Sequence, residues 1–126
     1  MVRNTASGWP GGDTHAGNFG RFGERCAREW YLAAGCRILD ANWRCRSGEL
    51  DLVVADGPDV VFVEVKARTS NRFGTGAEAV DARKRQRLRV LAGQWLAASH
   101  EHFAELRFDV VDVDRNGAVE VYRDCF

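Results

Sequence analysis

Three charged side chains stand within or directly after two apolar runs of the sequence, where strands of a protein core rarely carry charge. Asp51 lies in the run 50–55, Glu64 lies in the run 60–65, and Lys66 follows directly after it. Alternate residues of a strand share a face, so Glu64 and Lys66 are expected on the same side. Burying an unpaired carboxylate costs several kcal/mol. The pattern therefore predicts a compensating partner for the carboxylates: a cation, the lysine or a water-filled cleft.

The segment between the two runs is rich in turn-forming residues, Asp56-Gly57-Pro58-Asp59. Two apolar runs joined in this way predict adjacent strands of a hairpin. Strict alternation gives three sets of residues that share a face. These sets are Glu49, Asp51 and Val53 on the first strand, Phe62, Glu64 and Lys66 on the second, and Val61, Val63 and Val65 on its opposite, core-facing side.

Two carboxylates beside a lysine suggest metal-dependent chemistry on a phosphate. Mg²⁺ prefers oxygen ligands and is commonly held by one or two carboxylates together with water and substrate phosphate. Asp51 and Glu64 could supply these carboxylates. Lys66 could then orient the attacking water or stabilise charge that develops on the phosphate.

Length and composition indicate one ordinary globular domain. The chain has 126 residues, of which 45% are hydrophobic and 29% are charged. We expect a mostly disordered tail over residues 1–19, which are rich in glycine, and a single domain over residues 20–126. There is no apolar run of the roughly 20 residues that span a bilayer. The sequence also lacks an apolar signal-peptide region at its start, so we expect a cytoplasmic protein without membrane contact. The spacing of the four cysteines fits no common zinc pattern, and we expect free thiols.

Hydrophobic periodicity predicts an order of helix, three strands, helix and two strands. The expected elements are a helix over 21–34, a strand over 36–41, a loop over 42–48, strands over 50–55 and 60–65, a loop over 69–76, a helix over 78–98, and strands over 106–113 and 118–122. In the second helix the apolar face is formed by Val80, Leu88, Leu91, Ala92 and Trp95.

Several charged residues have two interpretations at this level. Glu24 is either a first-turn acid favoured by the helix dipole or part of a site. Lys84 falls on the apolar face of its helix, where its stem could cover the core while its amine reaches water. Alternatively, that amine could point at the carboxylates or at a phosphate. Glu49 is a candidate auxiliary ligand, whereas we expect Asp109 to be structural.

A longer run of matching residues marks a family. These residues are Gly23-Glu24, Asn42, Gly48-Glu49-Leu50-Asp51-Leu52, Phe62-Val63-Glu64-Val65-Lys66-Ala67-Arg68, Ala79-Val80, Lys84 and Arg107-Phe108-Asp109-Val110-Val111. On these residues the chain is identified as a member of the YraN family of small bacterial proteins. That family resembles PD-(D/E)XK nucleases, and in particular the archaeal Holliday-junction resolvases.

The resemblance implies both a fold and a site. The fold is α/β, with a restriction-endonuclease-like αβββαβ core in which helices flank a mixed central sheet. By position, Asp51, Glu64 and the Val65 carbonyl would hold Mg²⁺ or Mn²⁺. Lys66 would be the catalytic lysine, and Glu24 would complete the acidic site.

A basic segment accompanies the acidic residues, although the net charge of the chain is zero. Residues 67–89 carry seven basic and two acidic side chains, which favours contact with a nucleic-acid backbone. The expected contacts are Arg44, Arg46, Arg68, Arg72, Lys84, Arg85 and Arg89. For the run 83–89, a solvated helix face is the alternative.

The leading hypothesis is an endonuclease dependent on Mg²⁺ or Mn²⁺ that acts on DNA. The alternatives are a non-catalytic nucleic-acid-binding module that keeps the nuclease fold within a repair or recombination complex, and a structural domain with a buried ion-pair network. A homodimer is a further open alternative.

Overall fold

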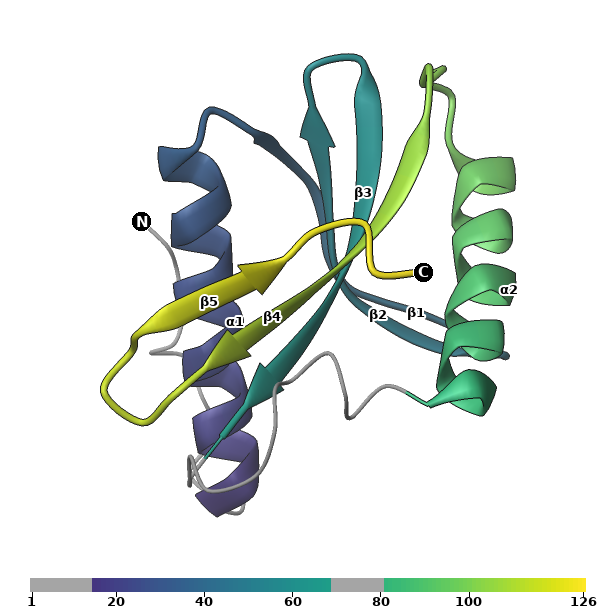
Figure 1. Ribbon diagram of the computed structural model, residues 1–126. Coiled ribbons are helices and arrows are strands. Elements are labelled where there is room, and N and C mark those ends of the chain that lie inside the picture. Colours follow the sequence, from purple (N-terminus) through teal and green to yellow (C-terminus); the bar gives the residue numbers. More distant parts are fainter. Residues whose placement is uncertain (1–14, 69–80) are drawn as a thin grey trace.

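The computed structural model describes residues 15–68 and 81–126, with side chains from residue 20 onward. It is an α/β structure in which two helices flank a five-stranded sheet (Figure 1). The elements are α1 (His15–Ala33), β1 (Arg37–Cys45), β2 (Gly48–Asp56), β3 (Asp59–Ala67), α2 (Ala82–Ala98), β4 (Leu106–Val113) and β5 (Val119–Tyr122). This arrangement confirms the predicted fold class and is consistent with a restriction-endonuclease-like core.

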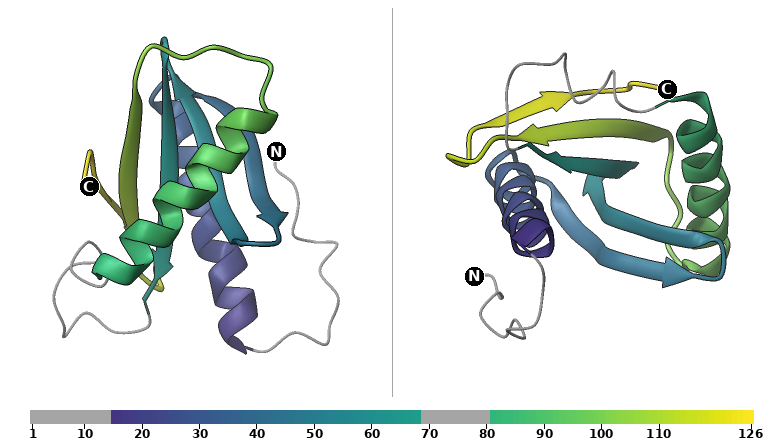
Figure 2. Two further views of the ribbon diagram at one scale, coloured as in Figure 1. Left: turned by 90° about the vertical axis from the view of Figure 1, so that its right-hand side faces the viewer. Right: turned by 90° about the horizontal axis from the view of Figure 1, so that it is seen from below.

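The strands follow the order β1-β2-β3-β4-β5, and every neighbouring pair except β3–β4 is antiparallel. Parallel strands need a crossover connection, and here the segment containing α2 provides it. The two helices therefore lie on opposite sides of the twisted sheet (Figure 2). Neither described helix combines the length and the apolar character that a membrane span would need.

Two apolar layers, one on each face of the sheet, form the core. On the α2 face, the Phe62 ring lies 5.8 Å from the Trp95 ring and 5.6 Å from the Phe108 ring, measured between centroids. On the α1 face, Val61 and Val63 pack in the layer that contains Ala27 and Tyr31. The expected core face of β3 is thereby confirmed.

The predicted apolar face of α2 is also confirmed where it can be seen. Its four buried residues are Leu88, Leu91, Ala92 and Trp95, whereas Val80 lies outside the described residues. The helix begins at Ala82 because the Asp81 carboxylate caps it, accepting the Lys84 N–H at 2.9 Å. The other helix, α1, begins at His15, six residues before the predicted start and within the predicted tail.

The loop predicted over 42–48 is wrong, because β1 continues to Cys45 and turns directly into β2 at Gly48. Trp43 and Cys45 pack against the core on the α2 face, while Arg44 points to solvent. This is the period-two pattern of a strand. The two arginines that alternate with Trp43 and Cys45, Arg44 and Arg46, made this segment read as a polar loop in the sequence.

Candidate functional site

Asp51 lies where strands β2 and β3 separate. Their regular pairing ends at Leu52 and Val63. At the preceding residue of β2, Asp51, the side-chain Oδ2 atom accepts the backbone N–H of Val65 at 2.9 Å. A side-chain hydrogen bond has thus replaced a backbone one, and the carboxylate sits beside the β3 residue between Glu64 and Lys66.

The β1–β2 hairpin changes face at this same point. Leu50 packs on the α2 face and Leu52 on the α1 face, although residues two apart normally share a face. On the paired strand β1, Trp43 packs on the α2 face and Ala41 packs on the α1 face, although these residues are also two apart. Strict alternation over residues 49–53 was therefore a wrong prediction.

The cause of this change is found on β1. The pairs Ala41–Leu52 and Trp43–Leu50 place Asn42 opposite Asp51. Asn42 has a φ of 55°, in the left-handed region, which interrupts the extended conformation of the strand. The irregular pair Asn42–Asp51 thus marks the point at which both strands rotate.

Glu64 lies on β3 on the same face as Phe62, as predicted, and this face packs against α2. It is 94% buried, and its Oε2 atom lies 2.6 Å from Lys84 Nζ and 4.0 Å from Lys66 Nζ. Both amines therefore approach the same carboxylate oxygen. Of the two interpretations of Lys84, its contact favours the amine that points at the carboxylates.

Glu24 reaches the sheet because α1 packs very closely on β3. A Cβ atom on Gly23 would lie 3.0 Å from Ala67 Cβ and 3.6 Å from Val65 Cγ1, so only glycine allows this approach without a shift. The next residue, Glu24, lies close enough to the Asn42 side chain for its amide to lower the pKa of the Glu24 carboxyl. Helix α1 and strand β1 thus bring a third carboxylate towards Asp51.

Burial and neighbouring carboxylates raise the pKa of two of the acidic groups, Asp51 and Glu24. Burial raises the pKa of Asp51 to about 8, the negative charge of Glu64 adds to the effect, and Glu24 and Glu49 contribute further. The pKa of Glu24 is also raised, first by burial and then by Glu49, while the hydrogen bond from Asn42 lowers it. We call Glu24, Glu49, Asp51 and Glu64 the acidic site.

The donor atoms of the acidic site fit a hard divalent cation. Asp51 and Glu64 offer carboxylate oxygens. Val65 follows Glu64 in the chain, is hydrogen-bonded to Asp51 through its N–H, and offers a backbone carbonyl. Nearby positive charge would also relieve the repulsion from Glu64, which adds to the effect of burial on the pKa of Asp51. Over residues 15–68 and 81–126, however, no three His, Cys, Asp or Glu side chains are grouped so that they could hold a metal. The site is therefore a two-carboxylate arrangement, with Lys84 on one oxygen of Glu64.

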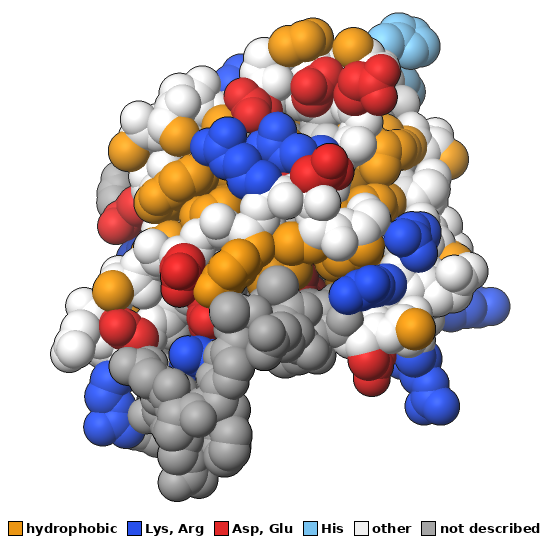
Figure 3. All heavy atoms as spheres, viewed as in Figure 1, with side chains coloured by type: hydrophobic (Ala, Val, Ile, Leu, Met, Phe, Trp, Pro, Cys, Tyr) orange, Lys and Arg blue, Asp and Glu red, His pale blue; other side chains and the backbone are white. Residues whose placement is uncertain are grey.

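The predicted phosphate contacts come from several elements of the structure. Arg46 is exposed, and Arg44 is exposed but lies 3.5 Å from Glu49. Arg85 and Arg89 place their guanidinium groups 5.5 and 5.8 Å from the centre of the Phe126 ring. Arg72 lies outside the described residues. On the face shown in Figure 3, basic side chains form separate groups with acidic ones between them.

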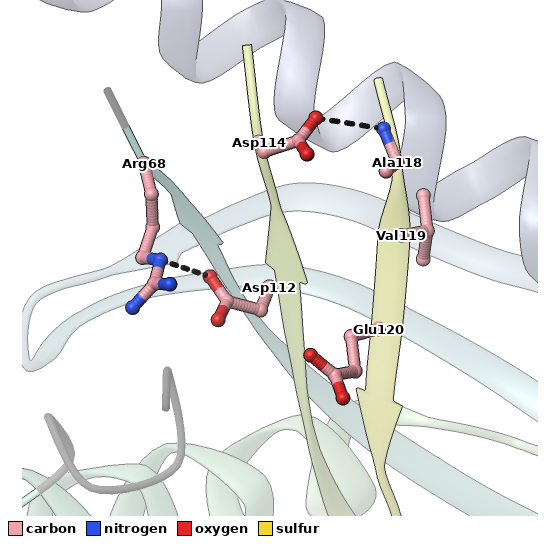
Figure 4. Close-up of a pocket in the computed structure, with 6 residues that line it drawn as sticks. All are labelled: Arg68, Asp112, Asp114, Ala118, Val119 and Glu120. Carbon is pink, nitrogen blue, oxygen red and sulfur yellow. Dashed lines mark hydrogen bonds and ion pairs between the residues drawn. The ribbon is translucent and has the colours of Figure 1, made fainter. Parts of the chain in front are cut away.

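Arg68 lines a pocket of about 400 Å³ at the far end of β3 and β4. Its Nε atom lies 3.1 Å from Asp112 Oδ1, and Asp114 and Glu120 add two further carboxylates to the lining (Figure 4). Asp112 is paired in register with Lys66, so the pocket adjoins the acidic site along the sheet. Carboxylates outnumber basic groups here, which makes the pocket a poor phosphate site.

Asp109 has the structural role predicted for it. It is fully buried on β4 and accepts hydrogen bonds from Tyr31 Oη at 2.7 Å and Arg107 Nε at 2.9 Å. Sequence analysis gave no role to Tyr31 in this network and none to Asn42 in the acidic site. Both contacts join elements far apart in the chain, which periodicity does not reveal.

Comparison with known proteins places the chain in a family. The model of the "Uncharacterised protein family UPF0102" matches residues 23–113, which include all four residues of the acidic site. A UPF0102 protein of Frankia alni is 56% identical over 96 residues, covering 76% of this chain and 80% of that protein. A UPF0102 protein of Mycolicibacterium vanbaalenii is 53% identical over 94 residues, covering 75% and 78%. The chain therefore belongs to the family UPF0102, the YraN family that its sequence resembles.

Proposed function

We propose that this protein is a nuclease dependent on Mg²⁺ or Mn²⁺ that binds DNA and cleaves its phosphodiester bonds. The observation that carries the proposal is the pair of carboxylates Asp51 and Glu64, which lie on neighbouring strands. Burial raises the pKa of Asp51, and the negative charge of Glu64 raises it further. Structural ion pairs normally balance their charges, whereas this site has an excess of carboxylates. A divalent cation is the partner that such an excess favours.

Each side chain has a role in this proposal. Asp51 and Glu64 hold the divalent ion, which supplies Lewis-acid stabilisation of charge on the phosphate. Lys66, which lies 4.0 Å from Glu64, orients the attacking water and stabilises the charge that develops in the transition state. Glu24 accepts a proton from that water, because its raised pKa makes it a better base than an exposed glutamate.

A non-catalytic binding module is the second candidate, and one contact favours it. Lys84 already places an ammonium group 2.6 Å from Glu64 Oε2, an oxygen that the proposed cation needs. If that ion pair persists in solution, the charge of Glu64 is balanced within the protein, this oxygen is closed to a metal and only nucleic-acid binding remains. The two candidates therefore differ in whether a divalent ion displaces Lys84.

Calorimetric titration with Mn²⁺, followed by a cleavage assay, tests the proposal. The assay uses single-stranded, duplex, flap and four-way-junction DNA with Mn²⁺, Mg²⁺ or a chelator. We expect Mn²⁺ binding that Asp51→Asn weakens strongly, together with cleavage that the chelator abolishes. DNA binding without metal binding or cleavage would instead favour the binding module. Equal Mn²⁺ binding by Asp51→Asn would remove Asp51 as a ligand.

A further inference from the structure

We infer that Asn42 is a positioning residue of the acidic site, whose backbone turns Asp51 towards β3 and whose side-chain amide holds the Glu24 carboxylate. The inference rests on the proposed function, because it gives Asn42 a part in arranging groups that bind the metal and the water.

The backbone of Asn42 provides the first argument. Its φ of 55° lies in the left-handed region of the backbone. Residues other than glycine rarely adopt this conformation, and asparagine tolerates it better than most. Asn42 lies opposite Asp51, and the residues on either side of this pair pack on opposite faces of the sheet. A regular strand would hold Asp51 in the alternating pattern. The rotation instead allows its carboxylate to reach the N–H of Val65.

The side chain of Asn42 provides the second argument. Its amide can donate a hydrogen bond to the Glu24 carboxylate without adding a charge to a site that already has several negative ones. An aspartate at this position would tolerate the same backbone conformation, but it would face Glu24 with a like charge. Asparagine therefore meets both requirements, a left-handed backbone and a neutral donor.

The position of Asn42 links three elements. Gly23 holds α1 against Ala67 on β3, and Asn42 connects the next residue of α1 to β1. On its own strand, Asn42 lies opposite Asp51 of β2. One residue thus couples the carboxylate of the helix to that of the sheet, as outer-shell residues of metal sites do.

Three substitutions separate the two roles of Asn42. Asn42→Gly keeps access to positive φ and removes the amide, whereas Asn42→Ala removes the amide and opposes the backbone conformation. Asn42→Asp keeps the shape and replaces the donor by a carboxylate. Asp124→Gly is a matched control, because Asp124 has a φ of 53° and lies exposed outside the acidic site.

Urea denaturation and Mn²⁺ calorimetry on the full chain give the expected pattern. Asn42→Gly and Asp124→Gly should both keep the stability of the wild type. Asn42→Gly and Asn42→Asp should bind Mn²⁺ about tenfold more weakly. In a Glu24→Gln background, Asn42→Gly should cause a clearly smaller loss. Wild-type Mn²⁺ affinity in Asn42→Gly would overturn the inference, and so would an equal loss in both backgrounds.

A measurement without metal keeps this inference separate from the proposed function. The side-chain amide resonances of Asn42 should shift on Glu24→Gln substitution, while the side-chain amide resonances of the exposed Asn116 should not. If the wild type binds no Mn²⁺, the proposed function fails. The Asn42 resonances then still show whether the amide of Asn42 contacts the carboxylate of Glu24. Asn42 resonances that are the same in both proteins would show that the amide does not hold Glu24.

Discussion

Lys84 Nζ lies 2.6 Å from Glu64 Oε2, so a side chain of α2 forms an ion pair with a buried carboxylate of the sheet. The lysine side chain is 35% exposed, whereas the glutamate side chain is 7% exposed. The ammonium group of Lys84 can therefore rotate into water, whereas the carboxylate of Glu64, which it neutralises, stays buried. In the proposed nuclease, Lys84 would leave Glu64 when a cation binds and would then contact a phosphate of the bound strand.

Substitution of Lys84 should reveal this competition. Lys84→Met leaves Glu64 without its closest cation and should lower the free energy of unfolding by about 1–2 kcal/mol, less than for a fully buried pair because the lysine is partly exposed. Mn²⁺ should restore that stability and bind more tightly than to the wild type. Urea denaturation with and without Mn²⁺ measures both effects. Arg83→Met, at an exposed residue of the same helix, is the control. Weaker Mn²⁺ binding in Lys84→Met than in the wild type would contradict competition and would show that Lys84 helps to form the metal site.

Metal affinity should depend on pH through Asp51. Its pKa of about 8 means that the carboxyl is mostly protonated at neutral pH, and a metal must displace that proton. Mn²⁺ affinity should therefore rise by up to about tenfold per pH unit from pH 6 to 8 and level off above pH 8. Calorimetry across this range measures the slope. A flat profile would show that Asp51 does not take up or release the relevant proton.

The same pKa gives a stability effect of opposite direction in the metal-free protein. Between its ordinary pKa of 3.8 and about 8, Asp51 binds more proton in the folded state than in the unfolded state. The contribution of Asp51 to the free energy of unfolding therefore falls as the pH rises through this window. Urea denaturation of the wild type and of Asp51→Asn should converge at low pH and diverge towards pH 8, and parallel curves would contradict the assignment.

The buried hydrogen bond from Tyr31 to Asp109 should support stability alone. Tyr31→Phe leaves one oxygen of a fully buried carboxylate without its hydroxyl donor and should cost about 1.5–3 kcal/mol. Mn²⁺ affinity should not change, because Asp109 lies outside the acidic site. Tyr122→Phe, at a partly exposed tyrosine near Glu120, is the control and should cost less. Loss of Mn²⁺ binding in Tyr31→Phe would contradict this prediction and would show that the network around Asp109 on β4 takes part in metal binding.

Arg85 and Arg89 should contribute to the salt dependence of DNA binding. Each neutralised phosphate contributes about −0.9 to the slope of log affinity against log salt on duplex DNA, so the double change to alanine should flatten it by about 1.8. Exposed Arg115, in the β4–β5 turn, is the control. An unchanged slope would assign both arginines to their contact with Phe126.

Local pattern was enough to predict most of the fold. Period-two alternation placed Glu64 and Lys66 on one face of β3, and the helical period placed Leu88 and Trp95 in the core, since both are properties of a single element. The conformation of Asn42 was not predictable, because it depends on the pairing of two strands. The closeness of α1 and β3 at Gly23 and the stacking of Arg85 on Phe126 also join distant parts of the chain. A regular period therefore predicted which residues could meet, and the packing of elements decided which do.

The measurement that tests the central claim most directly is cleavage and binding of DNA by Lys66→Ala, with Glu64→Gln beside it. If Lys66 acts in the transition state, Lys66→Ala should bind Mn²⁺ and DNA as the wild type does. Its cleavage rate should fall by about 10²–10³-fold, as when one preorganised electrostatic donor is removed. Glu64→Gln should lose both Mn²⁺ binding and cleavage. Cleavage that persists in both variants would contradict the assignment of the acidic site.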